Sequence, residues 1–230
     1  MSRNTAVDET TMESEVKERI EHGDRHIQRL RNVGNPRVFI ISGPSGVGKD
    51  SVLEQLRLAY PDAQYVVTAT SRAMRPGEIE GVHYHFIDRE DFERQIAAGE
   101  FIESANVYGN LYGVPRKPIV EGLEAGRNVI IKVDVKGAKT LREKITNPVS
   151  IFLAPESMEE LRERLRSRKT DNEEALNRRF NTASEELDRA EEFDYVVFNE
   201  SDRLDDAVRQ ITHIIEAELQ RINPPEVKIK

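Results

Sequence analysis

A glycine-rich loop at residues 43–49, GPSGVGK, has the composition and spacing of a phosphate-binding loop. Glycines let the backbone curl so that successive N–H groups point at one anion, and the lysine that ends the loop can reach nucleotide phosphates. An apolar run at 38–41 precedes the loop as a buried strand would, and apolar residues recur at helical spacing after it. This context favours a nucleotide site over an ordinary turn. The residues expected to line the phosphates are Gly43, Ser45, Gly46, Val47, Gly48, Lys49, Asp50 and Ser51.

Asp50 departs from the usual pattern, in which Ser or Thr follows the loop lysine. A carboxylate is a good hard-oxygen ligand, and the dipole favours it in the first turn of a helix. Ser51 is a poor substitute, because one step along a helix turns the side chain away by about 100°. We therefore expect Asp50 to help position Mg²⁺, directly or through water.

Composition limits the partners of the chain. Its 230 residues suit one large domain, or one domain with inserts. The absence of cysteine excludes disulfides and thiolate metal sites, and the net charge of −8 argues against duplex nucleic acid as a partner. No stretch has the apolar length of a membrane span, and the N-terminus is too polar for a signal peptide, so we predict a cytoplasmic protein with no membrane partner.

Strands and helices alternate along most of the chain, which predicts the α/β class. Alternation of this kind places a parallel sheet between layers of helices, and ligands then bind at the carboxyl ends of the strands. We expect a phosphate-loop core whose parallel sheet is flanked by helices. Further strands are predicted at 64–70, 129–135, 149–153 and 195–199, and helices at 117–125 and 204–218.

Two segments interrupt the alternation. Residues 72–114 combine turn signals with short apolar runs, which predicts a small, mostly β insert. Residues 155–180 form a highly charged helical stretch, and a solvated surface is the ordinary explanation for most of its arginines. The predicted division is a charged extension at 1–35 with one solvated helix, a main domain at 36–222 and a tail at 223–230, of which 223–226 are expected to be loose.

Five further motifs follow the phosphate loop along the chain. From residue 37 to residue 219 the sequence resembles the guanylate kinases, a family of phosphate-loop nucleoside monophosphate kinases. The resemblance implies transfer of the γ-phosphate of ATP to GMP, with Mg²⁺ as cofactor, a GMP-binding insert and a helical lid. The motifs are GPSGVGK at 43–49, TSRAMRPGE at 70–78, GVHYHF at 81–86, FIESANVYGNLYG at 101–113, DVKGA at 134–138 and RLRSRKTD at 164–171.

The acceptor site follows from the chemistry of GMP together with this resemblance. Guanine presents an N1–H and a 2-amino group, both donors, so a selective site should offer carboxylates. The resemblance places Glu103 and Asp134 in that role, with the hydroxyl of Thr68 assisting. Asp134 lies in an expected buried strand, where an unpaired carboxylate would be costly, whereas Glu103 could also be a surface residue on a half-exposed strand. The phosphate of GMP is expected to contact Arg72, Arg75, Tyr84 and Tyr112.

The donor site needs positive charge around the moving phosphoryl group rather than covalent help. By resemblance, Arg164 and Arg168 are lid arginines over the ATP phosphates, and Arg179 reaches the transferring group. Lys49 completes the set, and no general base is needed because the GMP phosphate is already ionised. By the same resemblance, Asn199 lies near the family's adenine-side segment.

Some residues depart from the family pattern, and two other functions stay open. Val114 removes a hydroxyl near GMP, Lys132 replaces an acid, and Lys169 replaces a lid glycine; Lys132 and Lys136 make the site less acidic. A non-catalytic guanylate-kinase-like binding module is one alternative, against which the intact loop argues. A related-fold kinase of a phosphorylated sugar is the other, although the GMP motifs should then be missing. The oligomeric state could be monomer or homodimer.

Overall fold

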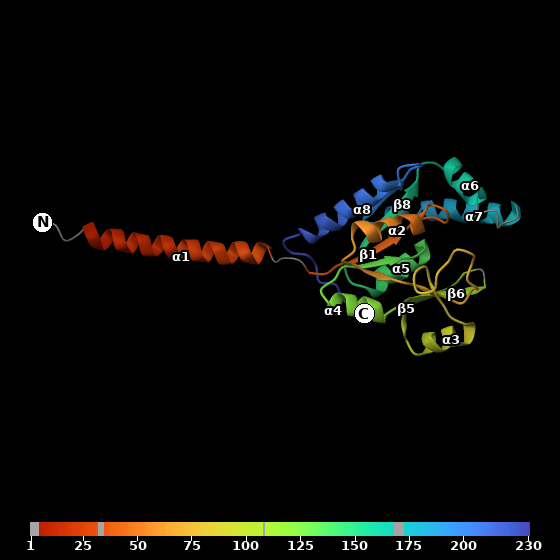
Figure 1. The fold of residues 1–230 in the computed structure, drawn as a ribbon, viewed down its shortest axis with the longest axis horizontal. Helices are drawn as coiled ribbons and strands as arrows, with labels where there is room; N and C mark the ends of the chain where they lie inside the picture. The colour runs from red at the N-terminus through yellow and green to blue at the C-terminus, as the bar shows by residue number, and fades with distance from the viewer. Residues whose placement is uncertain (1–4, 32–34, 108, 168–172) are drawn as a thin grey trace.

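The computed structural model describes residues 5–31, 35–107, 109–167 and 173–230, and its body is built on a five-stranded parallel sheet (Figure 1). The strand order is β2-β7-β1-β8-β9, so the predicted α/β class is confirmed. The central strand β1 lies between β7 and β8 and delivers the phosphate loop. The bounds are β1 Val38–Ser42, β2 Gln64–Val66, β7 Val129–Lys132, β8 Val149–Pro155 and β9 Tyr195–Asn199.

Both faces of this sheet are covered by helices, which explains why its strands are continuous apolar runs. Successive side chains of a strand point to opposite faces. Phe39 and Ile41 pack in one cluster with α2 and α8, and Val38 and Ile40 pack in the other with α4 and α5. The helices are α2 Lys49–Ala59, α4 Lys117–Glu124, α5 Val135–Lys144 and α8 Leu204–Leu219.

A second, four-stranded sheet of order β4-β3-β6-β5 forms the insert, together with one helix. Strands β5 and β6 pair antiparallel, and β3 pairs with β6 so that Thr70 lies opposite Tyr112. Phe92 and Phe101 stack beneath this sheet with ring centroids 4.6 Å apart. The bounds are β3 Ala69–Thr70, β4 His85–Phe86, α3 Arg89–Ala97, β5 Phe101–Val107 and β6 Asn110–Pro115.

Two predicted strands have different limits. The strand expected at 64–70 is divided: 64–66 join the parallel sheet, and 69–70 join the insert. An apolar run cannot show which sheet each half pairs with. The strand expected at 129–135 ends at Lys132, because Asp134 caps α5 by accepting a hydrogen bond from the backbone N–H of Gly137 at 2.7 Å.

The charged stretch after β8 forms two helices, α6 Met158–Ser167 and α7 Glu173–Leu187, and a 3₁₀ turn η1 Ala190–Glu192 follows. The charged composition predicts helix throughout this stretch but does not show where one helix ends and the next begins. In Figure 1, α6 and α7 lie at one end of the body, on the side away from α1.

The N-terminal helix extends away from the body (Figure 1), whereas the C-terminal residues pair with it. Helix α1 Thr5–Arg31 extends away from the body as the predicted solvated helix (Figure 1). Residues 227–230, beyond the stretch expected to be loose, are held to the body: Lys228 O accepts from the backbone N–H of Thr146, and Ile229 pairs with Ile145. Within the described part of the chain, no helix is both long and apolar enough to cross a bilayer.

Candidate active site

The phosphate loop is a tight turn with almost no room for side chains at its glycines. Gly43, Gly46 and Gly48 have φ of 144°, 91° and 95°, a region that favours glycine. A Cβ on Gly43 would lie 2.3 Å from the carbonyl oxygen of Leu153, and one on Gly48 would lie 2.5 Å from Nδ2 of Asn199. Helix α2 starts at Lys49 with no side-chain cap. The loop therefore presents a helix N-terminus suited to an anion.

Lys49 folds back over the loop. Its ammonium donates to the carbonyl oxygens of Gly43 at 2.6 Å and Pro44 at 3.0 Å. Burial lowers the pKa of Lys49, while the carboxylates of Glu186 and Asp50 act in the opposite direction. A cation so poorly solvated has a strong electrostatic preference for an incoming phosphate.

Helix α7 contacts the loop through two side chains that meet at Ser45. Arg179 Nη2 donates to the hydroxyl of Ser45 at 3.0 Å, and the backbone N–H of Ser45 donates to Glu186 Oε2 at 3.1 Å. Burial raises the pKa of Glu186, with Lys49 and the Ser45 N–H opposing the rise. Sequence reasoning missed Glu186, because it is one acid among many in a charged helix. An acidic side chain thus binds a loop amide of the kind that binds phosphate.

Arg164 and Asn199 both bind the carbonyl oxygen of Val47. Arg164 Nη1 donates to it at 3.1 Å and Asn199 Nδ2 at 2.7 Å. Arg164 also donates to the backbone oxygen of Asn199 and pairs with Glu160. These contacts join α6 and the end of β9 to the loop. Arg168, the other expected lid arginine, lies outside the described residues.

The two expected guanine-reading acids lie together although they come from different elements. Glu103 is on β5 and only 6% exposed, and Asp134 is the cap of α5. Both adjoin Gly137, where an added Cβ would lie 3.3 Å from Asp134 Oδ1 and 3.5 Å from Glu103 Cδ. Burial, assisted by the charge of Asp134, raises the pKa of Glu103 to about 7. Thr68 is also buried, in the segment between β2 and β3.

Arg72 is held by a carboxylate that sequence reasoning did not single out. Its two terminal nitrogens donate to Glu78 Oε2 at 2.7 Å and Oε1 at 2.5 Å, and this bidentate pair raises the pKa of Arg72. The backbone N–H of Arg75 donates to Glu78 as well, at 2.7 Å, while the Arg75 side chain is exposed. Nε of Arg72 is buried without a partner among the described residues. Glu78 sits six residues after Arg72 across a Pro-Gly turn, a spacing that could have revealed it.

Tyr84 and Tyr112 meet edge to face with centroids 6.1 Å apart. The guanidinium of Arg72 lies 5.1 Å from the Tyr84 ring centroid, and the ammonium of Lys132 lies 5.0 Å from the same centroid. Lys132 donates to Asp50 Oδ1 at 2.5 Å. Asp50, Lys132, Tyr84, Arg72 and Tyr112 therefore form one continuous cluster. Lys132 and Asp50, which belong to it, are both departures from the family pattern.

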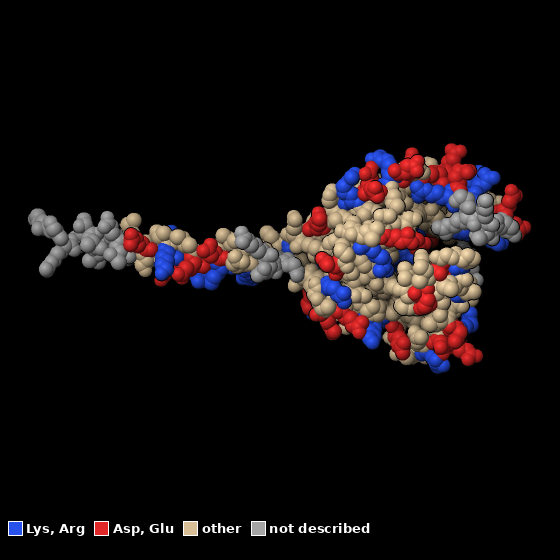
Figure 2. Space-filling model, in the orientation of Figure 1, with Lys and Arg blue, Asp and Glu red and all other residues tan. Residues whose placement is uncertain are grey.

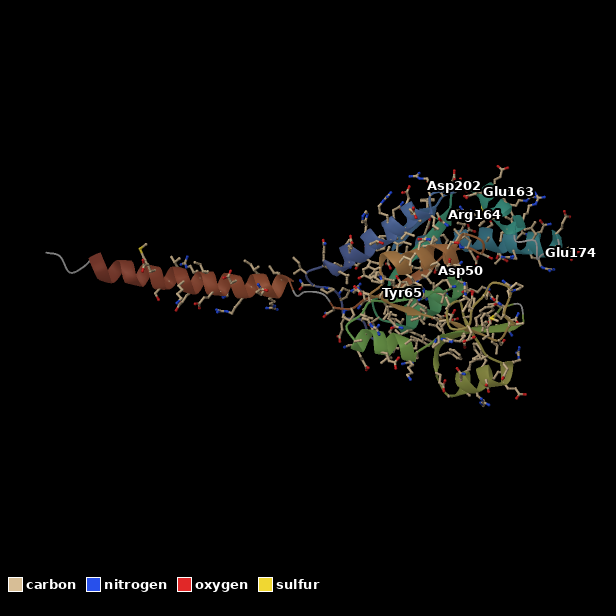
Figure 3. All side chains as sticks on the ribbon, viewed as in Figure 1. Asp50, Tyr65, Glu163, Arg164, Glu174 and Asp202 are labelled. Carbon is tan, nitrogen blue, oxygen red and sulfur yellow. The ribbon has the colours of Figure 1, made fainter. Side chains whose placement is uncertain are left out.

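Asp50 offers a single carboxylate to a metal ion. This carboxylate is exposed at the start of α2 (Figure 3) and already binds Lys132. Among the described residues no group of three His, Asp or Glu side chains could hold a metal ion by itself. Mg²⁺ commonly uses one or two carboxylates together with substrate phosphates and water, so Asp50 fits an ion that arrives with ATP.

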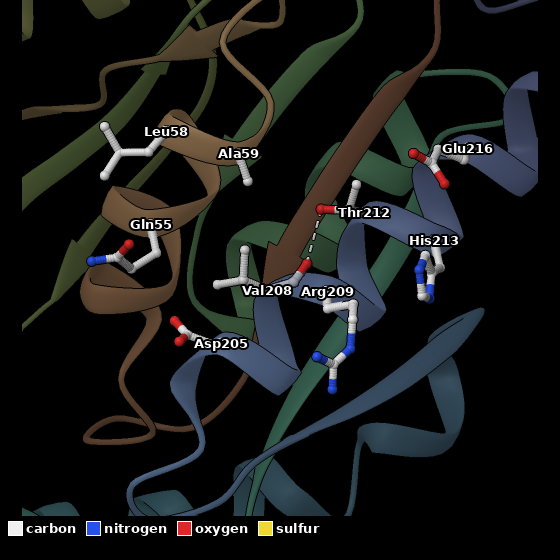
Figure 4. A pocket seen from close by; sticks show the side chains of 9 residues that line it. All are labelled: Gln55, Leu58, Ala59, Asp205, Val208, Arg209, Thr212, His213 and Glu216. Carbon is white, nitrogen blue, oxygen red and sulfur yellow. Dashed lines mark hydrogen bonds between the residues drawn. The ribbon is translucent and has the colours of Figure 1, made fainter.

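A hollow in the surface separates the lid helices α6 and α7 from the insert. Figure 2 shows the surface hollowed between the lid helices and the insert, with acidic side chains visible at its inner end. A different hollow, of about 510 Å³, lies between the C-terminal half of α2 and α8 and is lined by Gln55, Val208 and His213 among others (Figure 4). It is at the opposite end of α2 from Lys49 and holds none of the expected site residues.

Comparisons with known proteins identify the family of the chain. The family model of guanylate kinase matches residues 35–218. The chain is 42% identical over 193 residues to a guanylate kinase of Carboxydothermus hydrogenoformans, covering 84% of this chain and 93% of the relative. It is 43% identical over 195 residues to guanylate kinase 2, chloroplastic/mitochondrial, of Oryza sativa subsp. japonica, covering 84% and 68%. The crystal structure of guanylate kinase from Anaplasma phagocytophilum matches with a TM-score of 0.67 and 34% identity, over 82% of this chain and 88% of that one. The chain belongs to the guanylate kinase family.

Proposed function

We propose that this guanylate kinase transfers the γ-phosphate of ATP to GMP, giving ADP and GDP, within the unit formed by residues 36–222. The observation that carries the proposal is the pairing of two sites in one fold. A phosphate loop follows β1, and two carboxylates, one from β5 and one from the cap of α5, lie beside Gly137. The cations between them suit a reaction that brings two phosphates together.

On the donor side, we infer that the loop amides and Lys49 bind the β- and γ-phosphates of ATP. Lys49 would exchange the carbonyl oxygens of Gly43 and Pro44 for phosphate oxygens. Arg179, already within hydrogen-bond distance of Ser45, is placed to contact the transferring group. Arg164 supports the loop backbone from α6, and Arg168 stays a sequence-based expectation. The role of these cations is to offset the charge that spreads over the phosphoryl oxygens in the transition state.

On the acceptor side, we infer that Glu103 and Asp134 accept hydrogen bonds from guanine. The hydroxyl of Thr68, a buried residue between β2 and β3, would assist them. Adenine lacks this pair of donors, so AMP would leave the carboxylates unpaired. The phosphate of GMP would bind Arg72, Arg75, Tyr84 and Tyr112, and it needs no general base because it is already an anion.

Asp50 would help to hold Mg²⁺, directly or through water. The ion, when bound with ATP, would supply positive charge to the phosphates. We predict that Asp50→Asn raises the Mg²⁺ concentration needed for half-maximal rate. An unchanged rate and an unchanged magnesium dependence would contradict this role.

The test of the function is a coupled assay of ADP formation with GMP, dGMP or AMP as acceptor. We expect rapid ADP formation with GMP and a preference over AMP of as much as ~10⁴-fold. A non-catalytic binding module would bind GMP without forming ADP. A kinase of a phosphorylated sugar would ignore all three acceptors, and the match of the described insert to the GMP motifs argues against it.

A further inference from the structure

Lys132 occupies a position between the two nucleotide sites that the sequence alone did not reveal. It is the last residue of β7, and its side chain is only 12% exposed. Its ammonium touches an element from each site. Asp50, on α2, follows the loop lysine and accepts a hydrogen bond from it at 2.5 Å, while Tyr84, on the insert, places its ring centroid 5.0 Å away.

The ammonium of Lys132 has more hydrogen-bonding capacity than its surroundings use. An ammonium carries three N–H donors, and among the described residues Asp50 is the one hydrogen-bond acceptor that it reaches. The Tyr84 ring attracts the charge without accepting a directed hydrogen bond. Burial lowers the pKa of Lys132, but Asp50 and Tyr84 outweigh burial, so that the pKa is raised and the side chain stays charged.

A purely structural role explains this arrangement poorly. Asp50 is 56% exposed, and an ion pair with one exposed partner contributes little to stability. Bringing a lysine out of water costs more than burying an apolar side chain of similar size. A buried ammonium with donors to spare is, however, well suited to an anion that enters later.

The neighbours of Lys132 indicate which anion. Arg72 lies beside the same Tyr84 ring, at 5.1 Å, and each cation is paired with its own carboxylate, Arg72 with Glu78 and Lys132 with Asp50. A phosphate that binds Arg72 beside the Tyr84 ring would therefore meet a second positive charge in Lys132, which attracts it. Resting on the proposed function, we propose that Lys132 binds the phosphate of GMP on the side that faces ATP, as a further substrate-binding residue.

The test compares GMP with guanosine, which has the base but no phosphate. GMP binding is measured by calorimetry in EDTA without ATP, and guanosine is measured as a competitive inhibitor against GMP. Lys132→Met should weaken GMP binding about 10-fold or more, as loss of a charged hydrogen bond does, and leave guanosine inhibition unchanged. Lys132→Arg should retain a substantial part of the affinity. Lys139→Met, a change of an exposed lysine on α5, is the matched control and should have no effect.

The outcomes separate the inference from the proposed function. If wild-type protein binds and phosphorylates GMP but Lys132→Met binds GMP equally well, the inference is wrong and the function stands. Equal loss of GMP and guanosine binding would also overturn it, because a disturbed fold rather than a lost phosphate contact causes that pattern. If wild-type protein fails to bind GMP at all, the proposed function itself fails.

Discussion

At the residue scale, the site combines groups whose ordinary behaviour is altered by burial. Glu103 is buried beside another carboxylate, Lys49 is buried against the loop, and Glu186 binds a loop amide. Such perturbed groups gather where ligands bind, because the ligand supplies the missing partner. Each of them leads to a measurable consequence.

Arg72 is predicted to serve GMP and not ATP. Arg72→Met should raise the KM for GMP about 10-fold or more, because the charged contacts to the phosphate are lost, and leave the KM for ATP nearly unchanged. Steady-state kinetics with each substrate varied in turn measures both. Arg72→Lys keeps the charge without the planar fork, so its KM for GMP should lie between those of wild type and Arg72→Met. Arg89→Met, which removes an exposed ion pair with Glu93, serves as control. Equal damage to both KM values would count against the assignment.

The raised pKa of Glu103 predicts that GMP binding depends on pH. Its pKa of about 7 means that the carboxylate loses its charge as the pH falls through that value, and the protonated form no longer offers both oxygens to guanine. The KM for GMP should therefore rise below about pH 7 in wild type, and Glu103→Gln should abolish that pH dependence. A flat profile in wild type would show that Glu103 does not read the base.

The same pKa also makes a prediction about stability. A carboxyl group whose pKa is raised above its ordinary value of 4.5 favours folding fully below that value, and the advantage is lost as the pH rises through about 7. Without ligand, Glu103→Gln should therefore raise the Tm at about pH 8 relative to wild type and change it little at about pH 5. Thermal unfolding at both pH values measures this, and a lower Tm at the higher pH would contradict it.

Glu186 is predicted to oppose ATP binding, because its carboxylate takes the Ser45 N–H and faces Lys49 in the described state. Glu186→Gln removes a negative charge near the incoming phosphates and should lower the KM for ATP about 3-fold or more, with the KM for GMP unchanged. Glu185→Gln, an exposed neighbour on α7, is the control. A higher KM for ATP in Glu186→Gln would show that the carboxylate supports the donor site instead.

At the element scale, the sequence predicts individual helices and strands better than it predicts which of them pack or pair with each other. The phosphate loop, β9 and α8 follow directly from apolar spacing and glycines. The strand predicted at 64–70 is divided between two sheets, because a β period does not say which strand is the neighbour. Asp134, predicted within a strand, instead caps α5, since an acid after an apolar run suits either place.

The site shows the same limit for individual residues. Glu103, Asp134, Arg72 and Tyr84 are expected from the resemblance to the family. In the structure Glu103 and Asp134 both adjoin Gly137, and Arg72 lies beside the Tyr84 ring. The pairing of Lys132 with Asp50 could not be predicted, because the two residues are 82 positions apart and meet only when β7 lies beside β1. Periodicity and motif spacing describe local structure, whereas this contact depends on the order of strands in the sheet.

At the scale of the whole molecule, a buried ion pair links the start of the domain to its last helix. Arg37 and Glu218 are 3.4 Å apart with side chains 3% and 7% exposed, and Tyr195 donates to Glu218 at 2.6 Å. Arg37 also donates to the carbonyl oxygen of Pro225, so the pair anchors the tail. The apolar stripe of α8 gave no sign of a buried acid at position 218.

Removing one partner of this pair should weaken the fold. Glu218→Ala leaves Arg37 as an uncompensated buried charge and should lower the free energy of unfolding by about 3–5 kcal/mol. Urea denaturation of wild type and variant measures the difference, with Glu216→Ala on the exposed side of α8 as control. A loss below about 1 kcal/mol would show that the pair is not essential to the fold.

For the molecule as a whole, the central claim is that two nucleotides meet in one site and that phosphate passes between them. The most direct measurement is a product analysis by chromatography after wild-type protein is mixed with ATP, GMP and Mg²⁺. Equal amounts of ADP and GDP should form together, and neither should form when GMP is left out. ADP without GDP, or binding of both nucleotides with no product, would contradict the claim.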